Sequence, residues 1–213
     1  MQAIVVHALG GPEVLELRAH PTPDPGPGEV LVRIHAIGVN FSDTERRRGV
    51  YDPPRLPWIP GNEAAGVVEG LGAGVDRAWL GRRVAFWAPR TSGTYAEYVA
   101  APAAALFALR DDLDFSVGAA LPAQALTAYG MSHVATALTP GQTAVVHAAA
   151  GGVGALLVQL LQKRGVRVFG TASAPAKREL VRALGAVPLP YGPGLPALIG
   201  EATAGRGVDA VFD

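Results

Sequence analysis

The pattern of apolar and polar positions in the first part of this chain differs from the pattern after Leu121. In the first part, short runs with β-branched residues and partial alternation are separated by turn residues, a pattern typical of half-buried strands. Many short strands at this spacing predict a small barrel or sandwich. The expected strands are Ala3–His7, Val14–Ala19, Glu29–Val39, Ala64–Val75, Arg82–Ala88 and Thr94–Ala103.

The second part alternates strands with helices. Gly154–Gly165 places apolar residues at helical spacing and ends in basic residues before a glycine, and Pro175–Gly185 starts with proline and ends with glycine; both are helix signals. This alternation predicts a parallel, doubly wound sheet. We therefore expect two domains, residues 1–120 and 121–213. The other expected elements are strands at Thr143–Ala149, Val166–Ser173, Ala186–Tyr191 and Val208–Asp213, and helices at Ala120–Ala135 and Pro196–Gly207.

Composition narrows the class of protein. The 213 residues are 49% hydrophobic and 17% charged, with zero net charge, so no electrostatic argument favours nucleic acid or an anionic membrane as a partner. The chain has no cysteine, which excludes disulfides and thiolate zinc.

The N-terminus lacks the features of a secretion signal, so we expect a cytoplasmic protein. Phe115–Gln162 has no charged residue but is interrupted by prolines and glycines, which favours a buried core over a membrane span.

The glycine-rich segment HAAAGGVG, His147–Gly154, follows a predicted strand and opens a predicted helix. A glycine-rich motif between a strand and a helix is the arrangement that indicates a dinucleotide-binding site. Gly151 would form the tight turn, Gly152 would let the backbone approach a pyrophosphate, and Gly154 would let helix and strand pack, with the phosphate at the helix N-terminus. A plain strand–helix turn is the alternative. GLGAG, Gly70–Gly74, is not followed by a helix and predicts only a hairpin turn.

The end of the second strand in this part favours one dinucleotide. An NAD site has an acidic residue there that accepts from the ribose 2′-hydroxyl. Here Gly170–Ser173 contains no acid, and Lys177 and Arg178 follow. A hydroxyl and a cation suit a 2′-phosphate, so NADPH is predicted. The alternative is that Lys177 and Arg178 form an exposed helix face.

Several motifs together resemble the medium-chain dehydrogenase/reductase superfamily and, within it, the zinc-free quinone oxidoreductases related to zeta-crystallin. The segments on which this resemblance rests are PGPGEVLVRIHAIGVNFSD, LPWIPGNEAAGVVEGLGAGV, GTYAEYV, LPAQALTAYG, HAAAGGVG, GTAS and GRGVDAVFD. The resemblance implies a GroES-like β-barrel domain and a Rossmann domain, with the active site between them. Zinc enzymes of the superfamily carry cysteine and histidine where this chain has Asn40 and Asn62, so neither catalytic nor structural zinc is expected.

The resemblance also implies roles for individual residues. Asn40, Tyr51 and Thr127 would line the nicotinamide and substrate site, and the Asn40 amide or Tyr51 hydroxyl would meet charge on the acceptor oxygen. We interpret His147 as a structural histidine and Arg46–Arg48 as a solvated face. The expected cofactor-binding residues are Ala150, Gly151, Gly152, Val153, Gly154, Thr171, Ser173, Lys177 and Tyr191. The resemblance implies that Tyr191 lies beside the adenosine 2′-phosphate.

The resulting hypothesis is NADPH-dependent reduction of a quinone or an activated enone or carbonyl compound. Two alternatives stay open: an enoyl-thioester reductase, and a crystallin-like protein that binds NADPH without catalysis. In the family, further sheet strands and a dimer edge follow the position of Asp213. We therefore expect an incomplete Rossmann domain, a truncated or weakly active fragment, and a homodimer for the full-length parent.

Overall fold

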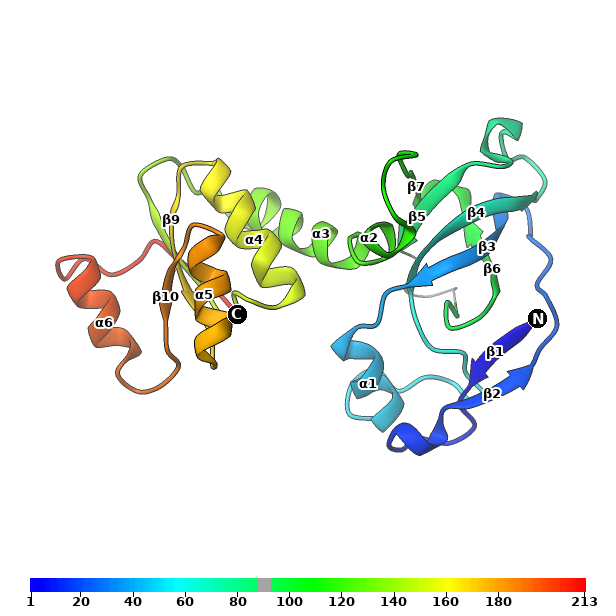
Figure 1. Ribbon diagram of the computed structural model, residues 1–213, viewed down its shortest axis with the longest axis horizontal. Helices are drawn as coiled ribbons and strands as arrows, with labels where there is room; N and C mark the ends of the chain where they lie inside the picture. The colour runs from blue at the N-terminus through cyan, green and yellow to red at the C-terminus, as the bar shows by residue number, and fades with distance from the viewer. Residues whose placement is uncertain (88–92) are drawn as a thin grey trace. The chain divides into compact units, whose positions relative to one another are not determined.

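The chain folds into two compact units, Met1–Ala123 and Gln124–Asp213 (Figure 1). The computed structural model describes residues 1–87 and 93–213, so Ala88, the last residue of one expected strand, lies outside the described residues. We had expected the boundary between the units at residue 120. Each unit has its own strands and its own buried residues.

The first unit is built on antiparallel strands. A two-stranded sheet pairs β1 with β2, and a five-stranded sheet has the order β6-β3-β4-β5-β7. The strands are β1 (Gln2–Val5), β2 (Glu16–Ala19), β3 (Glu29–Ile37), β4 (Glu63–Leu71), β5 (Arg83–Trp87), β6 (Tyr98–Pro102) and β7 (Leu106–Ala108). The helices are α1 (Phe41–Arg48), α2 (Phe115–Ala119) and the start of α3 (Pro122–Tyr129).

Alternation along the strands explains the core of the first unit. In β3, Val30 and Val32 are buried while their neighbours are partly exposed. Together with Val68, Val84 and Phe86 they fill one side of the sheet, and Ala119 of α2 packs on the other side. This is the GroES-like β-barrel unit predicted from the sequence.

The second unit is a doubly wound parallel sheet, as predicted. Its four strands have the order β10-β9-β8-β11, and every pair is parallel. The strands are β8 (Thr143–Val146), β9 (Arg167–Thr171), β10 (Val187–Leu189) and β11 (Ala210–Phe212). The helices are the remainder of α3, a π-helical turn (Gly130–Val134), α4 (Gly152–Lys163), α5 (Pro175–Ala183) and α6 (Leu195–Ala202).

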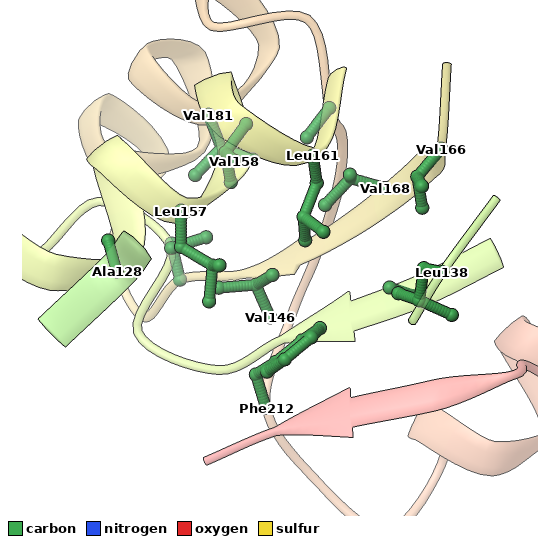
Figure 2. Close-up of a cluster of buried hydrophobic side chains, with 14 residues drawn as sticks. Ala128, Leu138, Val146, Leu157, Val158, Leu161, Val166, Val168, Val181 and Phe212 are labelled. Carbon is green, nitrogen blue, oxygen red and sulfur yellow. The ribbon is translucent and has the colours of Figure 1, made fainter. Parts of the chain in front are cut away.

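Both faces of this parallel sheet are covered. Figure 2 shows Val158 and Leu161 of α4 and Val181 of α5 packed with Val146 and Val168 of the sheet. Helix α6 covers the other face, where Ile199 packs on a separate cluster formed by Val145, Phe169 and Leu189. Strands buried on both faces are continuous apolar runs, which is why Thr143–Val146 has four buried residues in succession.

Two helices in the first unit were not expected. Helix α1 is almost entirely polar, and α2 has five residues, so neither shows an apolar stripe of helical period. The strand expected from Thr94 begins only at Tyr98, with Ala96 in an isolated bridge to Ala3. Within residues 1–87 and 93–213, no helix combines the length and the apolar character that crossing a bilayer would require.

Candidate functional site

One edge of the parallel sheet gathers the predicted cofactor residues. β8 ends at Val146, β9 at Thr171 and β10 at Leu189, and these three strands are parallel neighbours. The segments that follow them therefore lie along the same edge. This carboxyl edge is where doubly wound folds bind their ligands.

Helix α4 begins at this edge, with Gly151 as its N-cap residue and Gly152 as its first helical residue. The first N–H groups of a helix have no carbonyl partner within the helix, and a glycine cap has no side chain that could accept from them. Free N–H groups and the positive end of the helix dipole attract an anion such as a pyrophosphate. The start of α4 therefore fits the phosphates of a dinucleotide.

The turn before α4 contains an alanine in an unusual conformation. Gly151 was expected to form the tight turn, and its N–H does close it by donating to the Ala148 carbonyl at 2.7 Å. Gly151 itself is extended, with φ −81°, whereas Ala148 is left-handed, with φ +47°. The backbone strain of this turn therefore falls on a residue with a Cβ.

Gly154 is needed for the close approach between α4 and this turn. A Cβ at residue 154 would lie 2.4 Å from the Ala148 carbonyl oxygen and 2.8 Å from the Ala149 Cα. Both are backbone atoms and cannot rotate away. At Gly152 a Cβ would meet only the side chain of Gln124, at 2.9 Å. The tight packing predicted for Gly154 is therefore present in the structure.

The segment after β9 presents a hydroxyl and a cation to solvent. Ser173 and Lys177 are exposed, whereas Thr171 is fully buried. The Arg178 guanidinium donates to the carbonyls of Ala172 and Ser173 at 3.3 and 3.2 Å, so it anchors the loop. Arg178 is therefore not part of a plain exposed helix face, and Lys177 is the cation available to a ligand.

Tyr191, just beyond β10, reaches back to the glycine-rich segment. The Ala148 N–H donates to the Tyr191 hydroxyl oxygen at 2.8 Å, and the Tyr191 ring stacks on His147 with centroids 6.0 Å apart. His147 Nδ1 is 3.0 Å from the Thr171 hydroxyl. His147 thus has structural partners, as we interpreted it from the sequence.

In the first unit, Asn40 contacts a buried carboxylate. Asn40 Nδ2 donates to Glu63 Oε1 at 2.7 Å, and the Ala123 N–H donates to Glu63 Oε2 at 2.8 Å. Glu63 is 0% exposed, and a Cβ at Gly38 would lie 2.2 Å from its Oε1. Ala123 is the second residue of α3, so the acidic group lies at a helix N-terminus, where its charge is favoured. Glu63 thereby connects Asn40 with the start of α3.

A second carboxylate, that of Asp43, contacts the backbone of Asn40. Asp43 Oδ2 accepts from the Asn40 backbone N–H at 3.0 Å and from the Tyr95 hydroxyl at 3.3 Å. Burial raises the pKa of Asp43, although these two bonds and the charge of Arg46 oppose the rise. Burial, and then the Asp43 charge, raise the pKa of Tyr95 as well. Tyr95 therefore stays protonated at neutral pH and donates to Asp43.

Tyr51 and Asn40 are not brought together. Asn40 caps the start of α1 and Tyr51 follows its C-cap, Gly49, so about 12 Å of helix separates them. Tyr51 is 62% exposed, and Thr127 lies on α3 with an exposed side chain. The structure thus places Tyr51 and Asn40 at opposite ends of one helix.

The interpretation of Arg46–Arg48 as a solvated face is wrong for two of the three residues. The Arg46 side chain is 19% exposed; its Nε donates to the Asp52 carbonyl at 3.1 Å, and its guanidinium lies over the Trp58 ring. The Arg47 Nε is buried. Arg48 is the exposed member and pairs with Glu45 along the helix. Arg46 is structural because it holds the loop that follows α1.

Sequence reasoning missed Glu63 and Asp43. Both lie in quoted motifs, GNE and NFSD, and an acid three residues after an N-cap asparagine is a capping signal that could have identified Asp43. Glu63 had a weaker signal: it directly precedes the half-buried strand predicted from Ala64, and an acid that becomes buried needs a partner.

Comparisons with known proteins agree with this architecture. Residues 26–111 match the alcohol dehydrogenase GroES-like domain family. A probable quinone oxidoreductase of Schizosaccharomyces pombe is 37% identical over 211 residues, covering 99% of this chain and 63% of the relative. A mycobacterial protein solved in complex with NADPH has a TM-score of 0.95 at 40% identity, covering 100% of this chain and 66% of that one. A structure described as an NAD-dependent alcohol dehydrogenase has a TM-score of 0.91 at 36% identity, covering 99% and 70%.

A GroES-like unit and a Rossmann unit with a glycine-rich turn at the start of a helix, carried on one chain, define the medium-chain dehydrogenase/reductase superfamily. Within it, this chain is similar to proteins described as quinone oxidoreductases over nearly its whole length. The chain spans 63% of the length of the S. pombe relative and 66% of the mycobacterial one. Because both NADPH and NAD are named among similar proteins, the choice of dinucleotide has to be argued from this chain's own residues.

Proposed function

We propose that this chain is the dinucleotide-binding and substrate-binding portion of an NADPH-dependent oxidoreductase, which transfers hydride to a quinone or an activated enone or carbonyl compound without zinc. One observation carries the proposal. The carboxyl edge of the parallel sheet combines the uncapped start of α4 with a β9 end that has a hydroxyl and a cation but no acid. NADPH, when bound, supplies the hydride.

The residues at this edge fit the cofactor's charges. Ala150, Gly151, Gly152, Val153 and Gly154 are proposed to hold the pyrophosphate, because they place N–H groups at a helix start. Ser173 and Lys177, with the end of β9 at Thr171, are proposed to hold the adenosine 2′-phosphate. A carboxylate in their place would repel that phosphate and accept from a 2′-hydroxyl.

In the first unit, the Asn40 amide or, as the alternative, the Tyr51 hydroxyl is the proposed hydrogen-bond donor to the acceptor oxygen. In the second unit, Thr127 is a proposed substrate-contacting residue. Glu63 accepts one Asn40 N–H, which fixes the orientation of the carboxamide. The bond to Glu63 also supports the proposal that this site works without zinc. At residue 40 the chain has an amide group, and its N–H donates to the Glu63 carboxylate.

The cofactor assignment is tested by titrating the 213-residue chain with NADPH and NADH, following nicotinamide fluorescence. Lys177→Ala should weaken NADPH binding by roughly ten- to hundredfold, since it removes one charge-assisted contact, and leave NADH binding unchanged. Lys163→Ala is the matched control, because Lys163 is exposed in the last turn of α4. Equal losses for both nucleotides in Lys177→Ala, or tighter binding of NADH by the unmodified chain, would contradict the assignment.

The reaction is tested on the same chain by NADPH oxidation with a quinone acceptor, in the presence and absence of a metal chelator. We expect turnover that the chelator does not change. Metal-dependent alcohol oxidation would contradict the proposed chemistry, and faster turnover of a crotonyl thioester would identify an enoyl-thioester reductase instead.

A further inference from the structure

Tyr191 makes its hydrogen bond to the turn before α4. Its hydroxyl oxygen lies 2.8 Å from the Ala148 nitrogen, across 43 residues of sequence, and its ring lies nearly parallel to the His147 ring, with an interplanar angle of 14°. The side chain is half-exposed. Tyr191 thus connects the end of β10 with the end of β8.

The residue that receives this contact is strained. Ala148 has φ +47°, and left-handed backbone is unfavourable for a residue with a Cβ. Such a conformation persists only where its surroundings hold it. Here the Ala148 carbonyl accepts from Gly151, the Ala149 N–H donates to Thr171 at 3.0 Å, and the Ala148 N–H has the Tyr191 hydroxyl.

This turn determines where α4 begins. The Gly151–Ala148 bond directly precedes the first turn of the helix, and Gly154 packs against Ala148 and Ala149. A shift of Ala148 would therefore move the N–H groups that face the pyrophosphate. Because the pyrophosphate is common to NADH and NADPH, the effect would not depend on the 2′-phosphate.

We propose that Tyr191 is a positioning residue, which holds Ala148 in its left-handed conformation and so organises the pyrophosphate-binding turn for either dinucleotide. This inference rests on the proposed function. It differs from the role that the family resemblance implies, in which this tyrosine lies beside the 2′-phosphate and would distinguish NADPH from NADH.

The test is Tyr191→Phe in the 213-residue chain, which removes the hydroxyl and keeps the ring on His147. Titrations with NADPH and NADH, followed by nicotinamide fluorescence, should show both dissociation constants raised by a similar factor of roughly three to ten, the usual effect of one lost hydrogen bond. Tyr98→Phe, in β6 of the first unit, is the matched control and should leave both constants unchanged.

A second variant tests the mechanism by rescue. Glycine adopts the left-handed conformation without steric strain, so Ala148→Gly should make the Tyr191 hydroxyl dispensable. The double variant Ala148→Gly/Tyr191→Phe should therefore bind each nucleotide within about twofold of Ala148→Gly alone. A tyrosine that merely stabilised the fold elsewhere would not be compensated at residue 148.

Every other outcome of these titrations overturns either the positioning role of Tyr191 or the proposed function. A loss confined to NADPH would assign Tyr191 to the 2′-phosphate and overturn the inference, as would unchanged binding in Tyr191→Phe or failure of the rescue. In all of these cases the unmodified chain binds nucleotide and the proposed function stands. An unmodified chain that binds neither nucleotide would overturn the proposed function, and the positioning role would fall with it.

Discussion

Asn40 donates to two different buried carboxylates, one from its backbone N–H and one from its side chain. Its N–H donates to Asp43 and its Nδ2 donates to Glu63. The two acids are stabilised differently, because Glu63 accepts from the start of α3 whereas Asp43 relies on Tyr95. The Asp43 Oδ1 is buried without a hydrogen-bond partner among the described residues, which explains why burial dominates its pKa.

The raised pKa of Asp43 predicts a pH-dependent stability. The folded protein holds this proton more tightly than the unfolded chain, so the contribution of Asp43 to the free energy of unfolding falls as the pH rises from the usual aspartate pKa of about 3.9 through the raised value. Measured by chemical denaturation at a series of pH values, wild type should therefore lose stability relative to Asp43→Asn as the pH rises through this window.

Asp209 provides a control of opposite sign. Its carboxylate accepts from the Thr143 N–H and hydroxyl, which lowers its pKa. Here the stabilisation is present above the usual aspartate pKa and is lost as the pH falls through the lowered value. Wild type should therefore gain stability relative to Asp209→Asn as the pH rises. Parallel trends for Asp43→Asn and Asp209→Asn would contradict the assignment of burial as the cause at Asp43.

Helices and strands whose apolar residues recur at a regular spacing could be predicted from the sequence, whereas those without such a spacing could not. Val166–Ser173 and Gly154–Gly165 were expected within a few residues of β9 and α4. Helix α1 carries its signals at its ends instead, with Asn40 as N-cap and left-handed Gly49 as C-cap. A polar helix held by its caps has no periodic apolar stripe, which is the signal that periodicity detects.

Glycines inside helices give a prediction at the scale of elements. Gly154→Ala should lower the free energy of unfolding by about 1–3 kcal/mol and weaken binding of both nucleotides, because the new Cβ meets backbone at 2.4 Å. Gly200 in α6 is the matched control, since its Cβ position is open, and Gly200→Ala should raise the free energy of unfolding by about 0.5–1 kcal/mol. Denaturant titration measures both effects. A neutral Gly154→Ala variant would show that the turn shifts easily.

Across the whole molecule, motifs separated by many residues acquire meaning only through the fold. The sequence placed Gly151, Ser173 and Tyr191 in one predicted cofactor site, and the parallel order of β8, β9 and β10 explains why the segments carrying them share an edge. The contact between Tyr191 and Ala148 could not be predicted, because no spacing rule connects them. The same holds for Asn40 and Glu63, which meet across the β3–β4 pair.

The open edge of the parallel sheet gives a prediction about association. β11 is an edge strand of this sheet among the described residues, and its Val211 is 60% exposed. An exposed apolar edge strand is a template for pairing with another chain, and a lysine there opposes it. We expect the 213-residue chain to self-associate in sedimentation velocity at micromolar concentration, and Val211→Lys to weaken that association. Val134→Lys is the control, because Val134 is 79% exposed in a helical turn. An equal effect of Val134→Lys would show that exposed apolar area, and not the strand edge, drives the association.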